Sequence, residues 1–207
     1  MTATRGRPRT FDRQVALRRA MEVFWRRGYQ GASMTELTAA MGIASPSLYA
    51  AFGSKEALFR EAVDLYNATE GAGPRAALDG GKTARAAIEA MLRHHAYAYV
   101  DPANPSGCLV VLAGAGTVPE SDAVGQFLAT CRERDIAELR RRISRGMDEG
   151  DLPASVGPDA LARFVGAVVQ GMAVQARDGA TAEDLLGIVD CAMAAWDGLT
   201  RGGAPTS

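Results

Sequence analysis

The sequence predicts an all-α protein, in which a small helix-turn-helix head precedes a larger helical body. Two observations lead to this fold class. Apolar residues recur at helical spacing through almost all of the 207 residues. Residues 33–56 also read as two short helices joined by a tight turn and followed by the start of a third. The apolar run at 108–116 could be a strand by propensity, but because all other segments read as helical, we interpret it as a short buried helix and expect about nine helices in total.

Charge is divided between the two parts of the chain. Residues 1–60 hold ten Lys and Arg against four Asp and Glu, a net of +6, and the other 147 residues hold 13 against 20, a net of −7. The overall charge of −1 hides this division. A basic head on an acidic body suits a protein that approaches a polyanion with one end only.

The first helix of the predicted motif is marked by its cap and its end. Thr35 is a capping residue, and Leu37, Ala40 and Met41 give the helix an apolar face at steps of three and four. Gly42 then suits the left-handed conformation that ends a helix. The pattern indicates a helix over about 35–41.

The second helix is predicted to begin at Ser45 and Pro46, a side-chain cap followed by a ring that needs no N–H. Leu48 and Phe52 lie four residues apart and turn inward. A short helix whose other side is uncharged can enter a major groove of DNA without electrostatic conflict. The residues expected on or near that outer side are Ser45, Ser47, Tyr49 and Ala50.

Basic and helical segments flank this motif. Residues 1–10 form a tail broken by Gly and Pro, which is either a disordered terminus or an arm that brings Arg5, Arg7 and Arg9 to phosphates or a minor groove. A helix is expected from Phe11 to about Arg27, closed by Gly28. Another helix is expected from Lys55 to about Thr69, with Ser54 as its cap.

With these elements in order, the sequence resembles the TetR/AcrR family of bacterial repressors over roughly residues 11–65. The segment Ser-Leu-Tyr-x-x-Phe-x-Ser-Lys-Glu-x-Leu carries much of the resemblance. The matching residues are Gly28, Gly31, Thr35, Gly42, Leu48, Tyr49, Phe52, Lys55, Glu56 and Leu58. The resemblance implies a homodimer, a palindromic operator and a small-molecule effector bound in the body.

The resemblance also assigns roles to particular residues. It implies that the start of the third helix and its tyrosine contact DNA, here Ser45, Pro46, Ser47 and Tyr49, and that Thr35 and Lys55 contact phosphates. One departure is Ala51, where the family commonly has a histidine. With two alanines and few long donors on this face, we expect specificity to depend on thymine methyl contacts and DNA shape.

Beyond residue 70 the sequence predicts further helices. An amphipathic segment covers 75–100, and residues 101–107 break it. A short buried helix follows Cys108, a long helix covers about 121–147, another begins at Pro158, and the last begins after Thr181. The arginines at 140, 141, 142 and 145 are expected to form a solvated face.

The last two predicted helices are apolar around much of their circumference, which favours a homodimer held by a four-helix bundle. The alternative is that all of these residues form the core of one chain. Gly166, Ala167, Gly171 and Ala173 would allow close helix approach. The candidate interface residues are Phe164, Val168, Met172, Leu185, Val189 and Trp196.

Four residues are candidates for an effector pocket, namely Met91, His95, Tyr99 and Cys108, although such residues are more often core. His94 and His95 are adjacent, so they cannot act as an i,i+4 metal pair. The three cysteines are widely spaced without a CxxC pair, which favours a reducing cytoplasm. No enzyme motif and no cofactor or metal signature is recognised, and no membrane segment or signal peptide is expected.

The predicted organisation is a basic arm at 1–10, a DNA-binding head at 11–53, a connecting helix at 54–70, a body at 71–200 and a tail at 201–207. The predicted function is a cytoplasmic, ligand-responsive, sequence-specific DNA-binding regulator, most simply a repressor. Two alternatives remain: a constitutive DNA-binding regulator with no effector, and a helical ligand-binding or enzymatic protein with a vestigial head. The sequence does not identify the effector, the operator or the regulated genes.

Overall fold

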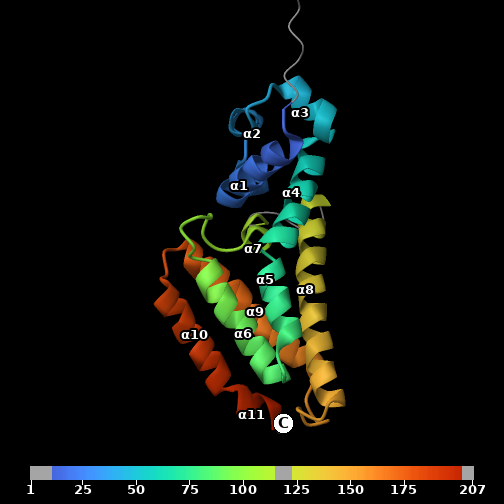
Figure 1. The fold of residues 1–207 in the computed structure, drawn as a ribbon, viewed down its shortest axis with the longest axis vertical. Coiled ribbons are helices and arrows are strands. Elements are labelled where there is room, and N and C mark those ends of the chain that lie inside the picture. The colour runs from blue at the N-terminus through green and yellow to red at the C-terminus, as the bar shows by residue number, and fades with distance from the viewer. Residues whose placement is uncertain (1–10, 115–122, 202–207) are drawn as a thin grey trace, which may run out of the picture.

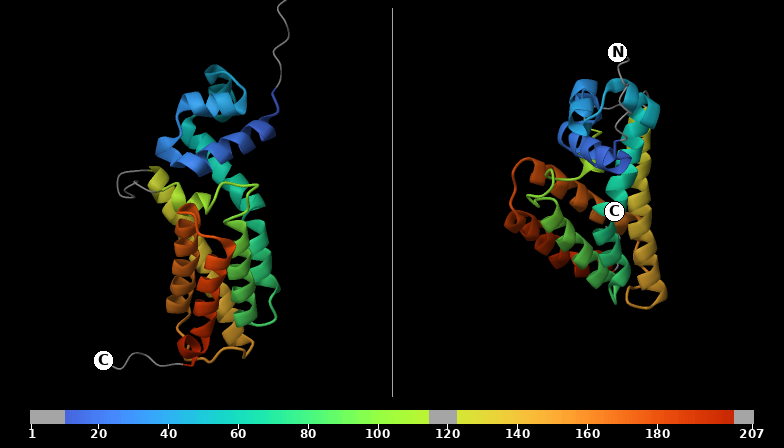
Figure 2. Two further views of the ribbon diagram at one scale, coloured as in Figure 1. Left: turned by 90° about the vertical axis from the view of Figure 1, so that its left-hand side faces the viewer. Right: turned by 45° about the horizontal axis from the view of Figure 1, so that its top comes forward.

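The computed structural model describes residues 11–114 and 123–201, and every regular element within these ranges is a helix (Figure 1). The predicted all-α fold is therefore confirmed. The head lies at one end of an elongated helical body, as two further views show (Figure 2). None of the helices in the described ranges has the length and apolar character needed to span a bilayer. The arm with Arg5, Arg7 and Arg9 falls outside these residues, as does the predicted start of the long helix at residue 121.

The head contains three helices. Asp12 caps the first, because its carboxylate accepts hydrogen bonds from the N–H groups of Gln14 and Val15 at 2.9 and 3.1 Å. Near the end of that helix the backbone leaves helical geometry at Gly28, with φ of 70°, where the sequence predicted a stop. The helices are α1 (Arg13–Gly31), α2 (Met34–Met41) and α3 (Ser45–Phe52).

The predicted caps of α2 and α3 are wrong by two residues and one residue, respectively. Ser33 caps α2, because its hydroxyl accepts the Glu36 N–H at 3.1 Å, and Thr35 lies inside the first turn. Ala44 precedes α3 without any side-chain cap, so Ser45 and Pro46 are already in its first turn. Gly42 ends α2 in the left-handed conformation as predicted, with φ of 68°.

A connecting helix, α4 (Lys55–Thr69), packs against α1 and continues into the body. Its bounds and its Ser54 cap agree with the prediction, since the Ser54 hydroxyl accepts the Ala57 N–H at 3.0 Å. Phe24 of α1 and Phe59 of α4 meet edge to face, with ring centroids 5.0 Å apart, and both are fully buried. This aromatic packing forms the core between the two helices.

The body surrounds a second core. Its helices are α5 (Ala72–Gly80), α6 (Ala84–Ala98), α7 (Leu109–Leu112), α8 (Ala123–Asp148), α9 (Pro158–Arg177), α10 (Ala182–Ala194) and α11 (Trp196–Thr200). The segment predicted as one unit at 75–100 is a pair of packed helices divided near Gly81, and the last helix breaks at Ala195. These two breaks raise the number of helical segments in the described ranges from the nine or so expected to eleven.

The run of arginines on α8 is not wholly solvated, as the sequence suggested it would be. Arg142 is 3% exposed, and its Nη2 donates to the carbonyl of Gly81 at 3.1 Å. Arg140, in contrast, pairs with Asp159 at the surface at 3.3 Å. Arg142 therefore ties α8 to the turn between α5 and α6, whereas the exposed arginines keep the predicted character.

Burial also corrects the candidate interface residues. Four of them lie within the core of the single chain and leave no surface for a partner: Met172, Leu185, Val189 and Trp196. Phe164 is 37% exposed and Val168 is half-buried. The wide apolar face of α9 is present as the sequence indicated. However, α6, α8 and α10 of the same chain pack against α9 and cover most of that face. Gly166 likewise serves a contact inside the chain, where a Cβ would collide with Ile136.

Replacing the observed cap of α2 should be more costly than replacing the predicted one. We expect Ser33→Ala to lower the free energy of unfolding by about 1 kcal/mol, because the Glu36 N–H loses its partner. Thr35→Ala, two residues away, should cost less than half as much. Urea denaturation of both variants checks this, and a larger loss for Thr35→Ala would mean that the cap has been misplaced.

Candidate nucleic-acid interface and ligand cavity

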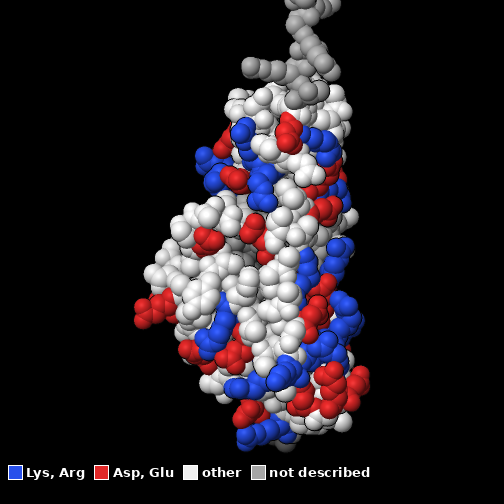
Figure 3. All heavy atoms as spheres, viewed as in Figure 1, with Lys and Arg blue, Asp and Glu red and all other residues white. Residues whose placement is uncertain are grey.

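The outer face of α3 is exposed and uncharged. Tyr49 is 50% exposed, Ser45 and Pro46 are exposed and Ser47 is half-buried, whereas Leu48 and Phe52 are buried beneath them. The tip of the head where α3 lies is largely free of charged side chains, and most of the head's charges lie below it (Figure 3). This is the surface that the sequence predicted for a major groove.

Arg13 fixes α3 on the rest of the head. Its guanidinium lies over the ring of Phe52, 4.3 Å from the ring centroid, and its Nη2 is 2.8 Å from the Glu61 carboxylate. The same Nη2 donates to the carbonyl of Ala51 at 3.3 Å. One side chain of α1 thus holds the C-terminal end of α3 and the middle of α4, which gives the exposed face of α3 a defined orientation.

The two candidate phosphate contacts lie at the starts of helices. Thr35 is exposed in the first turn of α2, and Lys55 is the first residue of α4. The Lys55 ammonium lies 4.6 Å from the centroid of the Tyr29 ring, and partial burial lowers the pKa of Lys55. Tyr29 is half-buried and packs on Phe59, with ring centroids 5.1 Å apart.

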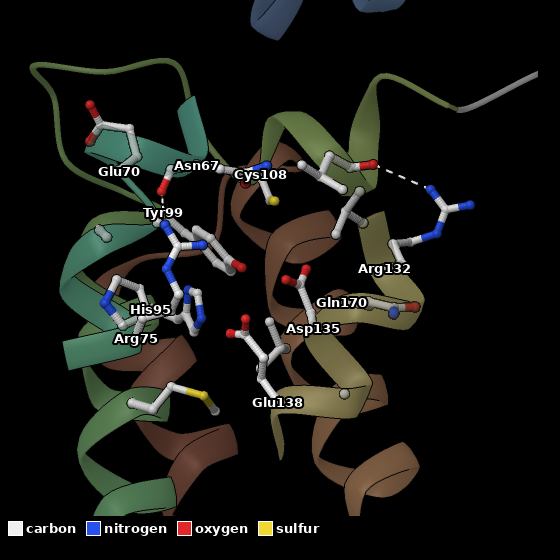
Figure 4. Close-up of a pocket in the computed structure, with 18 of the residues that line it drawn as sticks. Asn67, Glu70, Arg75, His95, Tyr99, Cys108, Arg132, Asp135, Glu138 and Gln170 are labelled. Atoms are coloured by element: carbon white, nitrogen blue, oxygen red, sulfur yellow. Dashed lines mark hydrogen bonds between the residues drawn. The ribbon is translucent and has the colours of Figure 1, made fainter. Parts of the chain in front are cut away.

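The body contains a partly open cavity of ≈ 110 Å³, bounded mainly by α4, α5, α6, α8 and α9 (Figure 4). All four candidate pocket residues, Met91, His95, Tyr99 and Cys108, line it. The structure thus brings together residues that are up to 17 positions apart in the sequence. Their role toward an effector remains a prediction. Tyr97, on the same helix, points away from the cavity and is 59% exposed.

Two tyrosines and the thiol of Cys108 share the cavity wall. Burial raises the pKa of both Tyr66 and Tyr99 well above the usual value, and interaction with Cys108 adds to the shift. Burial also raises the pKa of Cys108. The thiol is therefore protonated at neutral pH.

His95 faces the same space as a neutral base. Burial, assisted by the neighbouring His94, lowers the pKa of His95 to about 3. Its ring lies 4.8 Å from that of Tyr99, centroid to centroid, at a tilt of 36°. At neutral pH His95 can accept one hydrogen bond and donate another, but it carries no charge.

Several residues that line the cavity were not predicted from the sequence, among them Trp25, Tyr66 and the acidic side chains of α8. Asp135 and Glu138 both line the cavity, and burial together with Glu138 raises the pKa of Asp135 to about 6. A signal was present in the sequence, because these two carboxylates interrupt the inward-facing stripe that contains Cys131 and Leu139. For Trp25 and Tyr66, whose burial alone looked like ordinary core, the sequence offered no such signal.

The cavity reaches the head through Trp25, a residue of α1. The indole of Trp25 is 2% exposed and meets Tyr66 of α4 edge to face, with centroids 4.8 Å apart. The Trp25 carbonyl accepts a hydrogen bond from Arg177 of α9 at 2.9 Å. Nearby, the Tyr29 N–H donates to the carbonyl of Ala113 at 3.4 Å. The C-terminal end of α1 is therefore attached to three parts of the body.

An exposed third helix on a fixed three-helix head, carried on a body with a partly open cavity, defines a helix-turn-helix DNA-binding protein. Residues 16–62 match the family model described as bacterial regulatory proteins, tetR family. The chain belongs to this family, as its full-length relatives show.

Among curated proteins, the HTH-type transcriptional repressor ComR of Escherichia coli (strain K12) is 31% identical over 199 residues, covering 96% of this chain and 95% of ComR. The repressor BdcR of the same organism is 29% identical and covers 93% of this chain and 90% of BdcR. A solved structure of the TetR family regulator CifR, a cysteine mutant complexed with 26bp double-strand operator DNA, is 48% identical. It has a TM-score of 0.88 and covers 92% of this chain and 100% of the CifR chain.

His95 should make the protein sensitive to acid. The unfolded chain takes up a proton at the ordinary histidine pKa of about 6.5, whereas the folded chain resists it down to about 3. Between pH 7.5 and 5.0 this histidine should therefore cost about 2 kcal/mol of stability. We expect His95→Gln to lose correspondingly less stability over this range in urea denaturation.

His94→Gln is the matched control, since His94 is exposed on the same helix. It should lose nearly as much stability with falling pH as the unaltered protein, because burial, and not His94, is the main cause of the low pKa of His95. Asp135, whose raised pKa has the opposite effect between pH 6 and 4, is present in all three proteins and cancels in the comparison. Equal losses for His95→Gln and the unaltered protein would contradict the neutral, buried state of His95.

Proposed function

We propose that this protein is a homodimeric, sequence-specific DNA-binding regulator of transcription, acting in the cytoplasm as a repressor that a small molecule releases from its operator. The observation that carries the proposal is the exposed, uncharged face of α3, held by Arg13 on a rigid head. The operator complex of the CifR relative supports DNA as the partner. The proposal assigns no catalytic activity to the protein.

DNA recognition would use α3 in the major groove. Its outer face presents a phenol, two short hydroxyls and small apolar groups, which can approach base edges and thymine methyl groups closely. Thr35, Lys55 and the arm with Arg5 and Arg7 would contact phosphates or an adjacent minor groove. In a dimer the two α3 helices should lie about 34–36 Å apart, one helical turn of DNA, on an inverted repeat.

The surface left for a partner copy lies on α9 and α10. On α9 the exposed or half-buried residues recur at helical spacing, and a Cβ at Gly171 would meet open space. Small residues occupy three of the exposed positions of α10. The residues on this surface are Phe164, Ala167, Val168, Gly171 and Val174 of α9, with Gly187, Cys191 and Ala194 of α10. Small residues allow close helix packing in a four-helix bundle between two copies.

Release from the operator would begin at the side chains that line the cavity. Two helices that carry the head contribute to it, α1 through Trp25 and α4 through Tyr66 and Asn67. A ligand that occupies the cavity and displaces these side chains would change the angle of α4, and with it the separation of the two α3 helices. A difference of about 1–3 kcal/mol between the two states changes operator occupancy roughly 5- to 150-fold.

Tyr49 is the residue of α3 whose loss should weaken DNA binding most. We expect Tyr49→Ala to weaken binding to a selected inverted-repeat duplex by about 1–3 kcal/mol, or roughly 5- to 150-fold, because a base contact is lost. Fluorescence anisotropy with labelled duplex measures the affinity. The control is Tyr97→Ala, equally exposed but on the body, and the assignment fails if both variants bind like the unaltered protein.

Phe164→Asp should separate the dimer while leaving each chain folded. Its side chain is 37% exposed, so a charge there is tolerated in one chain but is buried in the proposed interface. Sedimentation at low micromolar concentration should show a monomer, whereas Val15→Asp, exposed on the head, should remain dimeric. Trp196→Asp should instead lower stability, because Trp196 is 4% exposed. A dimeric Phe164→Asp would place the interface elsewhere.

A further inference from the structure

We propose that the cavity of the body binds a small organic cation, a protonated amine with a short hydrocarbon portion, with Asp135 as the main anchor and Glu138 as the second. The inference rests on the proposed function, in which this cavity holds the effector, and adds the chemical class of the molecule. Its basis is the balance of hydrogen bonds and charges around the cavity.

Asp135 and Glu138 lie three residues apart on α8 and therefore on one face of the helix. Both carboxylates point into the cavity, toward His95 and Tyr99 on the facing helix α6 (Figure 4). Asp135 is solvent-accessible where the cavity opens and Glu138 is half-buried. Across the described ranges, Asp135 forms no hydrogen bond or ion pair with protein groups, and Glu138 has only an ion pair of 3.5 Å with Arg141 on the same helix. Acceptor oxygens are thus available in the cavity.

The two arginines of the wall do not neutralise these carboxylates by contact. The guanidinium of Arg75 donates to the carbonyl of Asn67, and that of Arg132 donates to the carbonyl of Val110 at 3.3 Å. Each is directed to the backbone of a neighbouring segment, and neither forms an ion pair with Asp135 or Glu138. Three carboxylates line the cavity against two guanidiniums, since Glu70 is also present at its wall.

His95 is a second polar group in the cavity that has no hydrogen-bond partner among the described residues. Its imidazole has no hydrogen bond to any described residue, although it lies within the body and faces the same space as Asp135 (Figure 4). Because it is neutral, it adds no positive charge opposite the carboxylates. It can accept a hydrogen bond from an N–H donor, which an ammonium group supplies and an ether or ketone does not.

Electrostatics favour the same class of ligand. Burial and the like charge of Glu138 raise the pKa of Asp135 to about 6, despite the opposing effect of Arg75. The ionised form of Asp135 is therefore less favourable in the empty cavity than in water, although it is still the main form at pH 8, and a cation beside it would stabilise it. The rings of Tyr99, Tyr66 and Trp25 line the same space and offer faces that attract cations.

The size of the cavity limits the ligand. Its ≈ 110 Å³ provides room for roughly eight water-sized groups, taking about 10–15 Å³ for each. This accommodates an ammonium group with a few carbons or one ring. The apolar part of the wall, which includes Met91, Leu78 and Val169, would receive the hydrocarbon portion.

The test compares amines with alcohols of the same shape. The probes are n-butylamine, cyclohexylamine and benzylamine, each paired with the corresponding alcohol, and binding is measured by isothermal titration calorimetry at pH 8 with the full-length protein. At least one amine should bind ten-fold or more tightly than its alcohol. Asp135→Asn should remove at least ten-fold of that affinity, and Glu138→Gln should remove a smaller part.

Glu133→Gln is the matched control, since Glu133 is exposed on the same helix and pairs with Arg163 at 3.2 Å. It should bind the amines like the unaltered protein. Lowering the pH from 8 to 5 should weaken amine binding, because Asp135 takes up a proton while the amines stay charged. Alcohol binding should not change. The other titratable groups facing the cavity, to be considered in that profile, are Tyr66, Glu70, Arg75, His95, Tyr99, Cys108, Arg132 and Glu138.

The proposal is overturned if every alcohol binds as well as its amine, if no amine binds at millimolar concentration, or if Asp135→Asn binds the amines unchanged. Operator affinity, measured separately by anisotropy, distinguishes this failure from failure of the proposed function. Intact DNA binding without amine binding removes the cation proposal alone. Amine binding that leaves DNA affinity unchanged supports the cation site and removes its role in release.

Discussion

The edge-to-face contact between Trp25 and Tyr66 is the interaction on which the arrangement of head and body depends. Trp25 belongs to the first helix of the head, and Tyr66 lies near the end of the helix that enters the body. Both rings are buried and both line the cavity. With the Arg177 bond to the Trp25 carbonyl, this contact makes the wall of the ligand cavity and the base of the DNA-binding head one continuous piece of structure.

Because head and body are joined in this way, the orientation of α3 in the head and the shape of the body depend on each other. The head must hold α3 in one orientation, which the contacts of Arg13 with Phe52 and Glu61 achieve. In the proposed mechanism the body changes shape when the cavity fills, and among the described residues it meets the head through segments of α1, α4 and α7 and through Phe127 of α8. Because interior packing is dense, a small displacement at Trp25 or Tyr66 has to be taken up by a shift of a whole helix.

Much of this could be predicted from the sequence, since the decisive signals are local. The all-α fold follows from helical periodicity, and the turn at Gly42, the buried pair Leu48 and Phe52 and the connecting helix from Lys55 to Thr69 follow from residues within a few positions of each other. The caps of α2 and α3 could not be placed, because Ser33 and Thr35 are equally good capping residues and tertiary packing chooses between them. The same limitation explains Arg142, whose burial depends on a turn some sixty positions away.

The candidate sites show the same difference between features set by local sequence and features set by tertiary packing. Exposure of Tyr49 could be inferred from its own helix, and the structure shows that the pocket candidates on α6 share one cavity with Cys108. The interface candidates were wrong in four cases, since apolar width on a helix does not tell which neighbour covers it. Asp135 and Glu138 were missed because their importance depends on the helices opposite them.

Selection of bound sequences from a random duplex pool tests the central claim most directly. The account predicts enrichment of an inverted repeat whose half-site centres lie about 34–36 Å apart, contacted by two copies of the chain. Recovery of unrelated sequences, or of a single half-site without its repeat, would contradict it.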